Sequence, residues 1–304
     1  MTRLSTKGHR WLGLGAALLA SMPLWAAPYY MQLASSALIA AMFALSLQLL
    51  TGGAGLVSLA HAGFFGLGAY TVYLLGGGSS VFVSVPAAML LSGVAATAIG
   101  RLALRTRGFY FLMTTLAFGQ MLFFLFHDTS LGGGADGVFI ARPGLIWAVT
   151  KSARPTVFLL LNLATLSLMY FSLWKLMGTM FGQALAGIRV NEDRMRAMGH
   201  DVQGLKLAAF IVSGALAGLA GHMAALTDAF VSPELLGWHR SAEALLMILL
   251  GGLGALHGPI LGAFALTLAR ELGQSITERQ RLVEGVVILA AVLLLRRGLA
   301  GWRQ

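Results

Sequence analysis

The sequence predicts an all-α integral membrane protein, a polytopic helical bundle with about 8–10 transmembrane helices. Of the 304 residues, 58% are hydrophobic and 11% are charged, whereas a soluble domain carries about 25% charged residues. The mean hydropathy is +0.80. We therefore treat residues 1–304 as a single transmembrane domain. Apolar runs long enough to cross a membrane core, some of them short or broken by glycine, lie at 11–27, 33–50, 56–76, 81–100, 109–126, 156–174, 207–226, 243–266 and 283–295.

The first run follows the basic start "MTRLSTKGHR" and has the form of a signal peptide. A cut after Ala27 would need a small residue three positions earlier, and the bulky Trp25 stands there. We therefore expect an uncleaved first span.

The basic residues predict the orientation of the chain. With the N-terminus inside, the segments 1–10, 101–108, 175–206 and 267–282 fall inside and hold 14 Lys and Arg. The segments 28–32, 76–80, 127–155 and 227–242 fall outside and hold 4, as the positive-inside rule requires. Nine simple crossings would nevertheless leave the basic end "RRGLAGWRQ" outside. One element between 243 and 295 should therefore be broken, re-entrant or doubled.

Two connecting segments are unusually long. The outer loop at 127–155 is rich in Gly and Pro and is either a lid or docking surface, or a solvated linker. Within the inner segment at 175–206, the pattern of residues 182–198 predicts a short amphipathic helix that stops at Gly199. Such a helix lies on lipid or enters a protein groove, and its mixed charges favour the groove.

Two glycine phrases read alike, "GGAGLVSLAHAGFFGLGAY" at 52–70 and "GGLGALHGPILGAF" at 251–264. Glycines let helices pack closely or unwind, and unwound backbone at membrane depth must be packed in protein or line a water-filled path. By the span count the phrases run in opposite directions, which predicts an inverted repeat around the translocation path; a pure packing motif is the alternative. The candidate path residues are Gly52, Gly53, Ser58, His61, Gly251, Gly252 and His257.

The role of the two histidines, His61 and His257, is open at this point. Each either hydrogen-bonds a freed backbone carbonyl or takes part in gating or substrate contact.

Several other chemistries are excluded or weakened. The formal charge of +10 has no soluble basic domain to carry it, which argues against a nucleic-acid partner. No lysine follows a glycine, so the chain lacks the phosphate-binding loop of an ATPase. No cysteine or paired histidine motif predicts a metal site or a catalytic residue. The predicted span interiors hold few ionisable residues, which weakens an ion-coupled mechanism.

An ordered set of motifs resembles the permease subunits of bacterial ABC importers for branched-chain amino acids, the hydrophobic amino acid uptake family. The set is "TGGAGLVSLAHAGFFGLGAY", "RGFYFLMTTLAFGQM" (107–121), "GGGADGV" (132–138), "GIRVNEDRMRAMGHD" (187–201), "KLAAFIVSGALAGLAG" (206–221), "VSP" (231–233) and "ILLGGLGALHGPILGA" (248–263). Asp193-Arg194-Met195-Arg196 replaces an alanine-rich stretch that is usual in the family, and Gly119 replaces a commoner alanine.

The resemblance implies a non-enzymatic, multi-pass subunit of the bacterial cytoplasmic (inner) membrane, surrounded by lipid. It implies no cofactor in this chain, with ATP and Mg²⁺ held by two separate ATP-binding subunits. It also implies a second homologous permease subunit and a periplasmic binding protein that delivers the substrate. The residues matching the ATPase-coupling region are Gly187, Arg189, Glu192, Ala197 and Gly199.

Two alternatives stay open from the sequence. The first is a sibling importer permease for urea, short amides or other small solutes. The second is a stand-alone secondary transporter, and a polytopic membrane enzyme ranks behind both.

Overall fold

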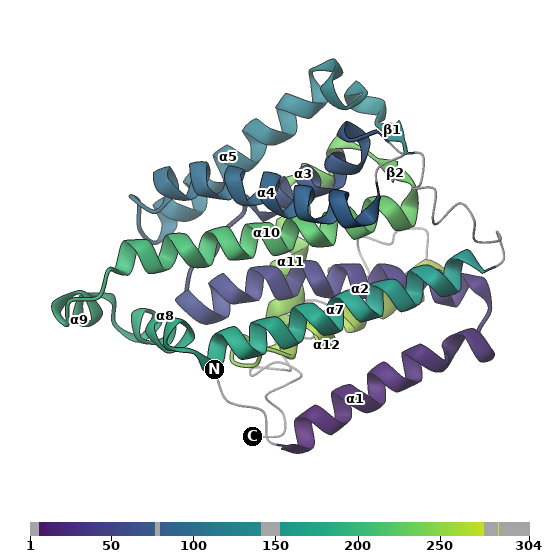
Figure 1. The fold of residues 1–304 in the computed structure, drawn as a ribbon, viewed down its shortest axis with the longest axis horizontal. Helices are drawn as coiled ribbons and strands as arrows, with labels where there is room; N and C mark the ends of the chain where they lie inside the picture. The colour runs from purple at the N-terminus through teal and green to yellow at the C-terminus, as the bar shows by residue number, and fades with distance from the viewer. Residues whose placement is uncertain (1–5, 77–79, 141–152, 277–284, 286–304) are drawn as a thin grey trace.

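The computed structural model describes residues 6–76, 80–140, 153–276 and 285, and it shows a helical bundle (Figure 1). The longer helices α2, α4, α7 and α10 lie along the long axis of the molecule, and α8 and α9 project at one end (Figure 1). The helices are α1 (Thr6–Ser21), α2 (Pro28–Gln48), α3 (His61–Leu74), α4 (Val81–Ala103), α5 (Phe109–His127), α7 (Arg154–Gly178), α8 (Met180–Val190), α9 (Glu192–Ala197), α10 (Val202–Asp228), α11 (Trp238–Gly251) and α12 (Gly258–Ile276).

Five of these helices are long and apolar enough to cross a membrane. They are α2 with its π-helical continuation η2 (Leu49–Ala54), α4, α5, α7 and α10. Helices α1, α3, α11 and α12 were not among the five, and α3 and α11 have only 14 residues each. The predicted all-α polytopic fold is confirmed, and the last predicted run, 283–295, falls outside the described residues apart from residue 285.

The bundle contains two similar sets of helices. The first set of helices is α2 with η2 (27 residues), α3 (14 residues) and α4. The second set has the same order of lengths: α10 (27 residues), α11 (14 residues) and α12. The long helices α2 and α10 are antiparallel, because Ser46 contacts Ser213 while Ile39 shares a cavity with Asp228. The two sets of helices therefore match in their order of lengths, and their first helices run in opposite directions, as in an inverted repeat.

The glycine phrases are not the equivalent parts of this repeat. The run 243–266 is not one span but two helices, α11 and α12, joined by a turn at 252–257. Both α3 and α12 run antiparallel to α2. For α3, Phe43 packs on Phe65, and Ser46 is joined through Ser213 to His61. For α12, Tyr29 bonds Glu271 and Gln48 bonds Leu253. The expectation that the phrases run in opposite directions is wrong, since the extra turn reverses the second one.

The same turn divides the predicted span 243–266 into two antiparallel helices. If both helices cross the membrane, they add one crossing to the count, which is the number that a basic end on the inside requires. The turn also moves 267–276 out of the predicted inner segment 267–282, because these residues belong to α12.

Small residues bring the repeats into close contact. A side-chain carbon at Gly68 would collide with the backbone of Gly218, and one at Gly221 would collide with the carbonyl of Phe65. Helices α3 and α10 can approach this closely only without those carbons, as in other membrane helix pairs with small residues at the contact. Helix α10 consequently sits at the centre of the bundle, packed against α2, α3 and α4.

The predicted amphipathic helix at 182–198 is two helices rather than one. Asn191 has extended backbone angles, ends α8, and caps α9 by accepting a hydrogen bond from the Arg194 N–H at 2.9 Å. An asparagine at this position competes with the helix backbone and starts a new helix. The predicted stop at Gly199 is confirmed, since its φ of 83° is left-handed.

The outer loop at 127–155 contributes a short strand. After two 3₁₀ turns (Ser130–Gly132 and Gly134–Asp136), β1 (Val138–Phe139) pairs antiparallel with β2 (Phe230–Val231). A third 3₁₀ turn, η5 (Pro233–Leu236), leads from β2 towards α11. The loop and the segment after α10 are thereby joined at the end of the molecule away from α9 (Figure 1). Residues 141–152 of the loop lie outside the described residues.

Candidate translocation path and coupling segment

The first glycine phrase contains a stretch of irregular backbone inside the bundle. Residues 55–60 connect η2 to α3, beginning at Gly55 with a φ of 71°. The Thr115 hydroxyl lies 3.2 Å from the Leu59 N–H and accepts from it, while the Ser241 hydroxyl donates to the Leu59 carbonyl at 2.9 Å. Ser241 also accepts from the Ala62 N–H at 2.8 Å. Side-chain hydroxyls thus replace the helical hydrogen bonds that this backbone gives up.

His61, at the start of α3, is fully buried. Its Nε2 lies 2.6 Å from the Ser213 hydroxyl, which donates in turn to the Ser46 carbonyl at 2.6 Å. Because the Ser213 hydroxyl donates its single proton to the Ser46 carbonyl, it accepts a hydrogen bond from His61. The ring proton of His61 is therefore on Nε2. His61 therefore joins α3 to α2 and α10. Ser58, another candidate path residue, is also fully buried.

The second glycine phrase lies against the end of α2. The Gln48 amide donates to the carbonyls of Leu253 and Ala255, at 3.0 and 3.3 Å. Gly252 has a φ of 104°, which turns the chain between α11 and α12. Gly251 contacts the backbone of Gly258 across this turn. His257 directly precedes α12 and is partly buried. The fold therefore brings the two phrases together at one end of α2.

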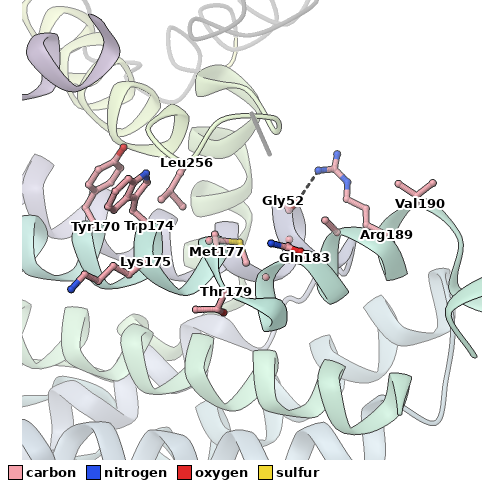
Figure 2. A pocket seen from close by; sticks show the side chains of 14 residues that line it. Gly52, Tyr170, Trp174, Lys175, Met177, Thr179, Gln183, Arg189, Val190 and Leu256 are labelled. Atoms are coloured by element: carbon pink, nitrogen blue, oxygen red, sulfur yellow. Dashed lines mark hydrogen bonds between the residues drawn. The ribbon is translucent and has the colours of Figure 1, made fainter. Parts of the chain in front are cut away.

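A cavity of about 970 Å³ lies beside the two phrases (Figure 2). Gly52 and Gly53 of the first phrase and Leu256 of the second line it, together with residues from the end of α7 and from α8. Tyr170, Trp174 and Lys175 of α7 and Gln183 and Arg189 of α8 are among them (Figure 2). Of the seven candidate path residues, Gly52 and Gly53 are the two that line this cavity; Ser58, His61, Gly251, Gly252 and His257 are not in its lining.

Arg189 ties α8 to the first glycine phrase. Its guanidinium donates to the Gly52 carbonyl at 2.7 Å (Figure 2). The carbonyl belongs to the π-helical end of α2, where the backbone departs from regular α-helical bonding. A charge-assisted bond to such a carbonyl is stronger than a neutral one, so it fixes α8 to the end of α2.

Glu192 ties α9 to α10. Its carboxylate accepts from Lys206 at 2.6 Å and from Arg196 at 2.9 Å. Lys206 is buried at 8% exposure. Partial burial raises the pKa of Glu192, but the hydrogen bond and charge of Lys206, with the charges of Arg107 and Arg196, outweigh it, so the pKa falls below the ordinary value. The Glu192 carboxylate is thus ionised, and its contact with Lys206 holds the start of α9 against α10.

The remaining predicted coupling residues shape the helix pair. Gly187 leaves room for Met195, whose sulfur would lie 2.7 Å from a side-chain carbon at that position. Ala197 ends α9, and Gly199 follows it in the left-handed conformation. Val190 and Met198 are exposed apolar side chains at the two helix ends, at 87% and 58%.

Sequence reasoning missed the partners of these groups. Ser213, Ser241 and Thr115 sit in apolar helices, and Lys206 sits in the first turns of α10. The signal was available, because a hydroxyl or a lysine placed within apolar sequence must find a polar partner. What the sequence could not show is which partner each one finds.

An inverted arrangement of helices with irregular backbone held inside the bundle recurs in membrane transport proteins. The family model described as the branched-chain amino acid transport system / permease component matches residues 29–295 of this chain. The chain belongs to that family.

Two relatives are similar to this chain over different lengths. The high-affinity branched-chain amino acid transport system permease protein LivM of Escherichia coli (strain K12) is 30% identical over 292 residues, which cover 88% of this chain and 69% of that protein. The autoinducer 2 import system permease protein LsrC of Escherichia coli O9:H4 (strain HS) is 31% identical over 109 residues, 34% of this chain and 32% of that protein. No solved structure matches.

Proposed function

We propose that this chain forms the translocation path for branched-chain amino acids in an ATP-driven importer of the bacterial inner membrane. A soluble periplasmic binding protein delivers the substrate to the outer face, and two separate ATP-binding subunits hydrolyse ATP with Mg²⁺. A second, homologous permease subunit completes the membrane part. The family match over residues 29–295 and the LivM relative support this assignment.

The helix pair α8–α9 is the observation that carries the proposal. It projects from the bundle at the end that the basic residues place inside (Figure 1), and it exposes Val190 and Met198 there. A short helix that presents apolar side chains can bind in a groove of a partner protein. Its inner side is tied to Gly52 on α2 and to Lys206 on α10. A partner that moves α8–α9 would therefore move both long helices.

Alternating access follows from these connections. ATP and substrate each favour one of two conformations, and the permease links the two binding events through shared elements. In our proposal the ATP-binding subunits move α8–α9. The hydrogen bonds of Arg189 to Gly52 and of Lys206 to Glu192 transmit this movement to α2 and α10. The cavity lined by Gly52 and Gly53 then opens inward as the exit of the path. The chain performs no chemistry on the substrate.

Uptake by the assembled transporter tests the function. The permease is reconstituted in proteoliposomes with its partner subunits, ATP and the binding protein, and uptake of radiolabelled leucine and urea is compared. We expect ATP-dependent leucine uptake and none of urea. Urea uptake without leucine uptake would assign the chain to the sibling class of importers, and uptake that needs no ATP would assign it to secondary transporters.

Copurification tests the docking surface. Val190→Asp or Met198→Asp should reduce recovery of the ATP-binding subunits with the permease, because a charge replaces an exposed apolar contact. Phe139→Asp is the matched control, since Phe139 is 84% exposed at the opposite end of the molecule. Equal recovery with all three variants would place the docking surface elsewhere.

A further inference from the structure

A second cavity, of about 230 Å³, lies between the two copies of the inverted repeat. Residues of α2 and α3 line one side, and residues of α10, η5 and α11 line the other. It opens near the start of α2 and the end of α10, since Ser36 and Asp228 both border it. Helices α8 and α9 lie at the other end of both long helices, so this cavity faces the side that the basic residues place outside.

Charged groups of both signs gather at this cavity. Arg240, Glu243 and Asp228 line it. The Glu243 carboxylate contacts Arg270 at 2.9 Å and Arg240 at 3.9 Å. The contact to Arg240 is at the outer limit of an ion pair, and the Arg240 side chain is 47% exposed. Its guanidinium, with five N–H donors, therefore keeps donors for another carboxylate.

The rest of the cavity wall is apolar. Ile39 and Phe43 of α2, Phe65 of α3 and Met247 of α11 line it, and Phe43 and Phe65 pack on each other with ring centroids 4.8 Å apart. Charged groups beside an apolar wall give the cavity both polar and apolar contact surface, as pockets for small ligands have. Its volume lies below the roughly 300–1,000 Å³ of pockets for drug-sized ligands, so the ligand is small.

We propose that this cavity is an outer binding site for a free amino acid with a branched aliphatic side chain. The substrate's carboxylate binds the Arg240 guanidinium, its ammonium group binds the carboxylates of Asp228 and Glu243, and its side chain lies against Ile39, Phe43 and Phe65. Burying a zwitterion costs free energy unless both charges are paired, and the cavity supplies a partner for each. The inference rests on the proposed function and names the substrate contacts of that same path.

Two variants test the polar and apolar halves of the site separately, in the reconstituted complex described above. Arg240→Gln should raise the KM for leucine about tenfold or more, because it removes a charge-assisted hydrogen bond. Ala40→Leu fills the cavity beside Ile39, and should lower the ratio of leucine to alanine uptake about tenfold, because a methylene-scale change in a hydrophobic pocket discriminates by that order. Arg240→Lys, which keeps the charge, should fall between wild type and Arg240→Gln.

The controls carry the same substitutions on exposed positions of α4, Arg101→Gln and Ala98→Leu. Both should keep the wild-type KM and the wild-type leucine-to-alanine ratio. The KM and the ratio are read on the active fraction, so a loss of folded protein alone does not imitate the expected result. If Arg240→Gln leaves the KM for leucine at the wild-type value, and Ala40→Leu leaves the leucine-to-alanine ratio at the wild-type value, the site is wrong. Absence of leucine uptake by the wild-type complex would overturn the proposed function instead.

Discussion

At the scale of single residues, the polar groups inside the bundle act mainly on one another. The buried ring of His61 bonds Ser213, and Ser213 bonds the Ser46 carbonyl. This chain of two hydrogen bonds crosses three helices at the point where α3 begins. The sequence left two roles open for His61, a bond to a freed backbone carbonyl or a part in gating or substrate contact. The partner of its Nε2 is the Ser213 hydroxyl and not a carbonyl, so we propose instead that His61 is a structural cross-link between helices.

Removing the Ser213 hydroxyl tests that role. Ser213→Ala leaves the His61 Nε2 and the Ser46 carbonyl without their bond, which costs about 1–3 kcal/mol for buried polar groups. We expect a lower thermal unfolding midpoint of the purified permease. Ser172→Ala is the control, because the Ser172 hydroxyl is exposed and bonds only its own helix. Equal midpoints for the two variants would contradict the cross-link.

Glu192 and Lys206 form the second residue-scale feature, and it concerns coupling. Glu192→Gln should leave the buried Lys206 charge poorly compensated and loosen α9 from α10. We expect leucine uptake per ATP hydrolysed to fall about fivefold or more, the lower range of allosteric coupling energies. The exchanged pair Glu192→Lys with Lys206→Glu should recover part of the loss. No recovery, or no loss in the single variant, would remove this tie from the coupling route.

The same pair predicts a pH dependence. Because the pKa of Glu192 lies below its ordinary value of 4.5, its stabilising contribution is fully present above 4.5 and is lost as the pH falls through the lowered pKa. Amide hydrogen exchange in α9 should therefore speed up, beyond its intrinsic pH dependence, only in the acidic range below 4.5. Glu192→Gln should show fast exchange at every pH. Acceleration in the wild type at neutral pH would contradict the assignment.

At the scale of elements, close helix contacts depend on a few glycines. A side-chain carbon at Gly262 would collide with the Met247 carbonyl, and one at Gly251 with the Gly258 carbonyl. Helices α11 and α12 therefore pack backbone to backbone. The packing-motif interpretation of the second glycine phrase thus describes Gly251 and Gly262, while Gly252 supplies the turn.

A substitution at Gly262 tests whether α11 and α12 pack backbone to backbone. Gly262→Val should destabilise the permease by about 1–3 kcal/mol or more, because overpacking displaces backbone. Gly254→Ala is the control, since nothing lies within 4 Å of a side-chain carbon there. Protein yield and thermal unfolding midpoint measure the difference. A Gly262→Val protein as stable as the control would show that α11 and α12 do not pack this closely.

At the scale of the whole molecule, the turn at 252–257 changes the expected direction of the chain after α11. Helices α11 and α12 form an antiparallel pair where one span was expected, so residue 276 lies at the end of the molecule opposite to the turn at 252–257. If the predicted run 283–295 crosses once more, the basic end of the chain lies inside, as the positive-inside rule requires.

A tag after Gln304 tests this topology. We expect protease to remove the tag in inside-out vesicles and to spare it in right-side-out vesicles. A tag after Phe139 in the outer loop is the control and should show the opposite accessibility. Cleavage of the C-terminal tag only in right-side-out vesicles would leave the run 283–295 without a crossing.

Composition and residue order were enough to predict the class of fold and the positions of most spans, and the orientation that Lys and Arg indicate stays a prediction. Apolar runs and the distribution of Lys and Arg carry that information, because insertion into lipid depends on local composition. Motif order also pointed to the family, and the matches over residues 29–295 confirm it. The break within 243–266 was predicted only as one of three possibilities.

Which residues contact one another depends on the tertiary structure. The sequence placed Arg189 and Glu192 in the coupling region, but it could not show that they face Gly52 and Lys206 of their own chain. The two glycine phrases have similar sequences, but they are not equivalent parts of the repeat, which pairs α2, α3 and α4 with α10, α11 and α12. The physical reason is that hydrogen bonds across more than a hundred residues depend on how the helices pack, and packing is a property of the assembled bundle.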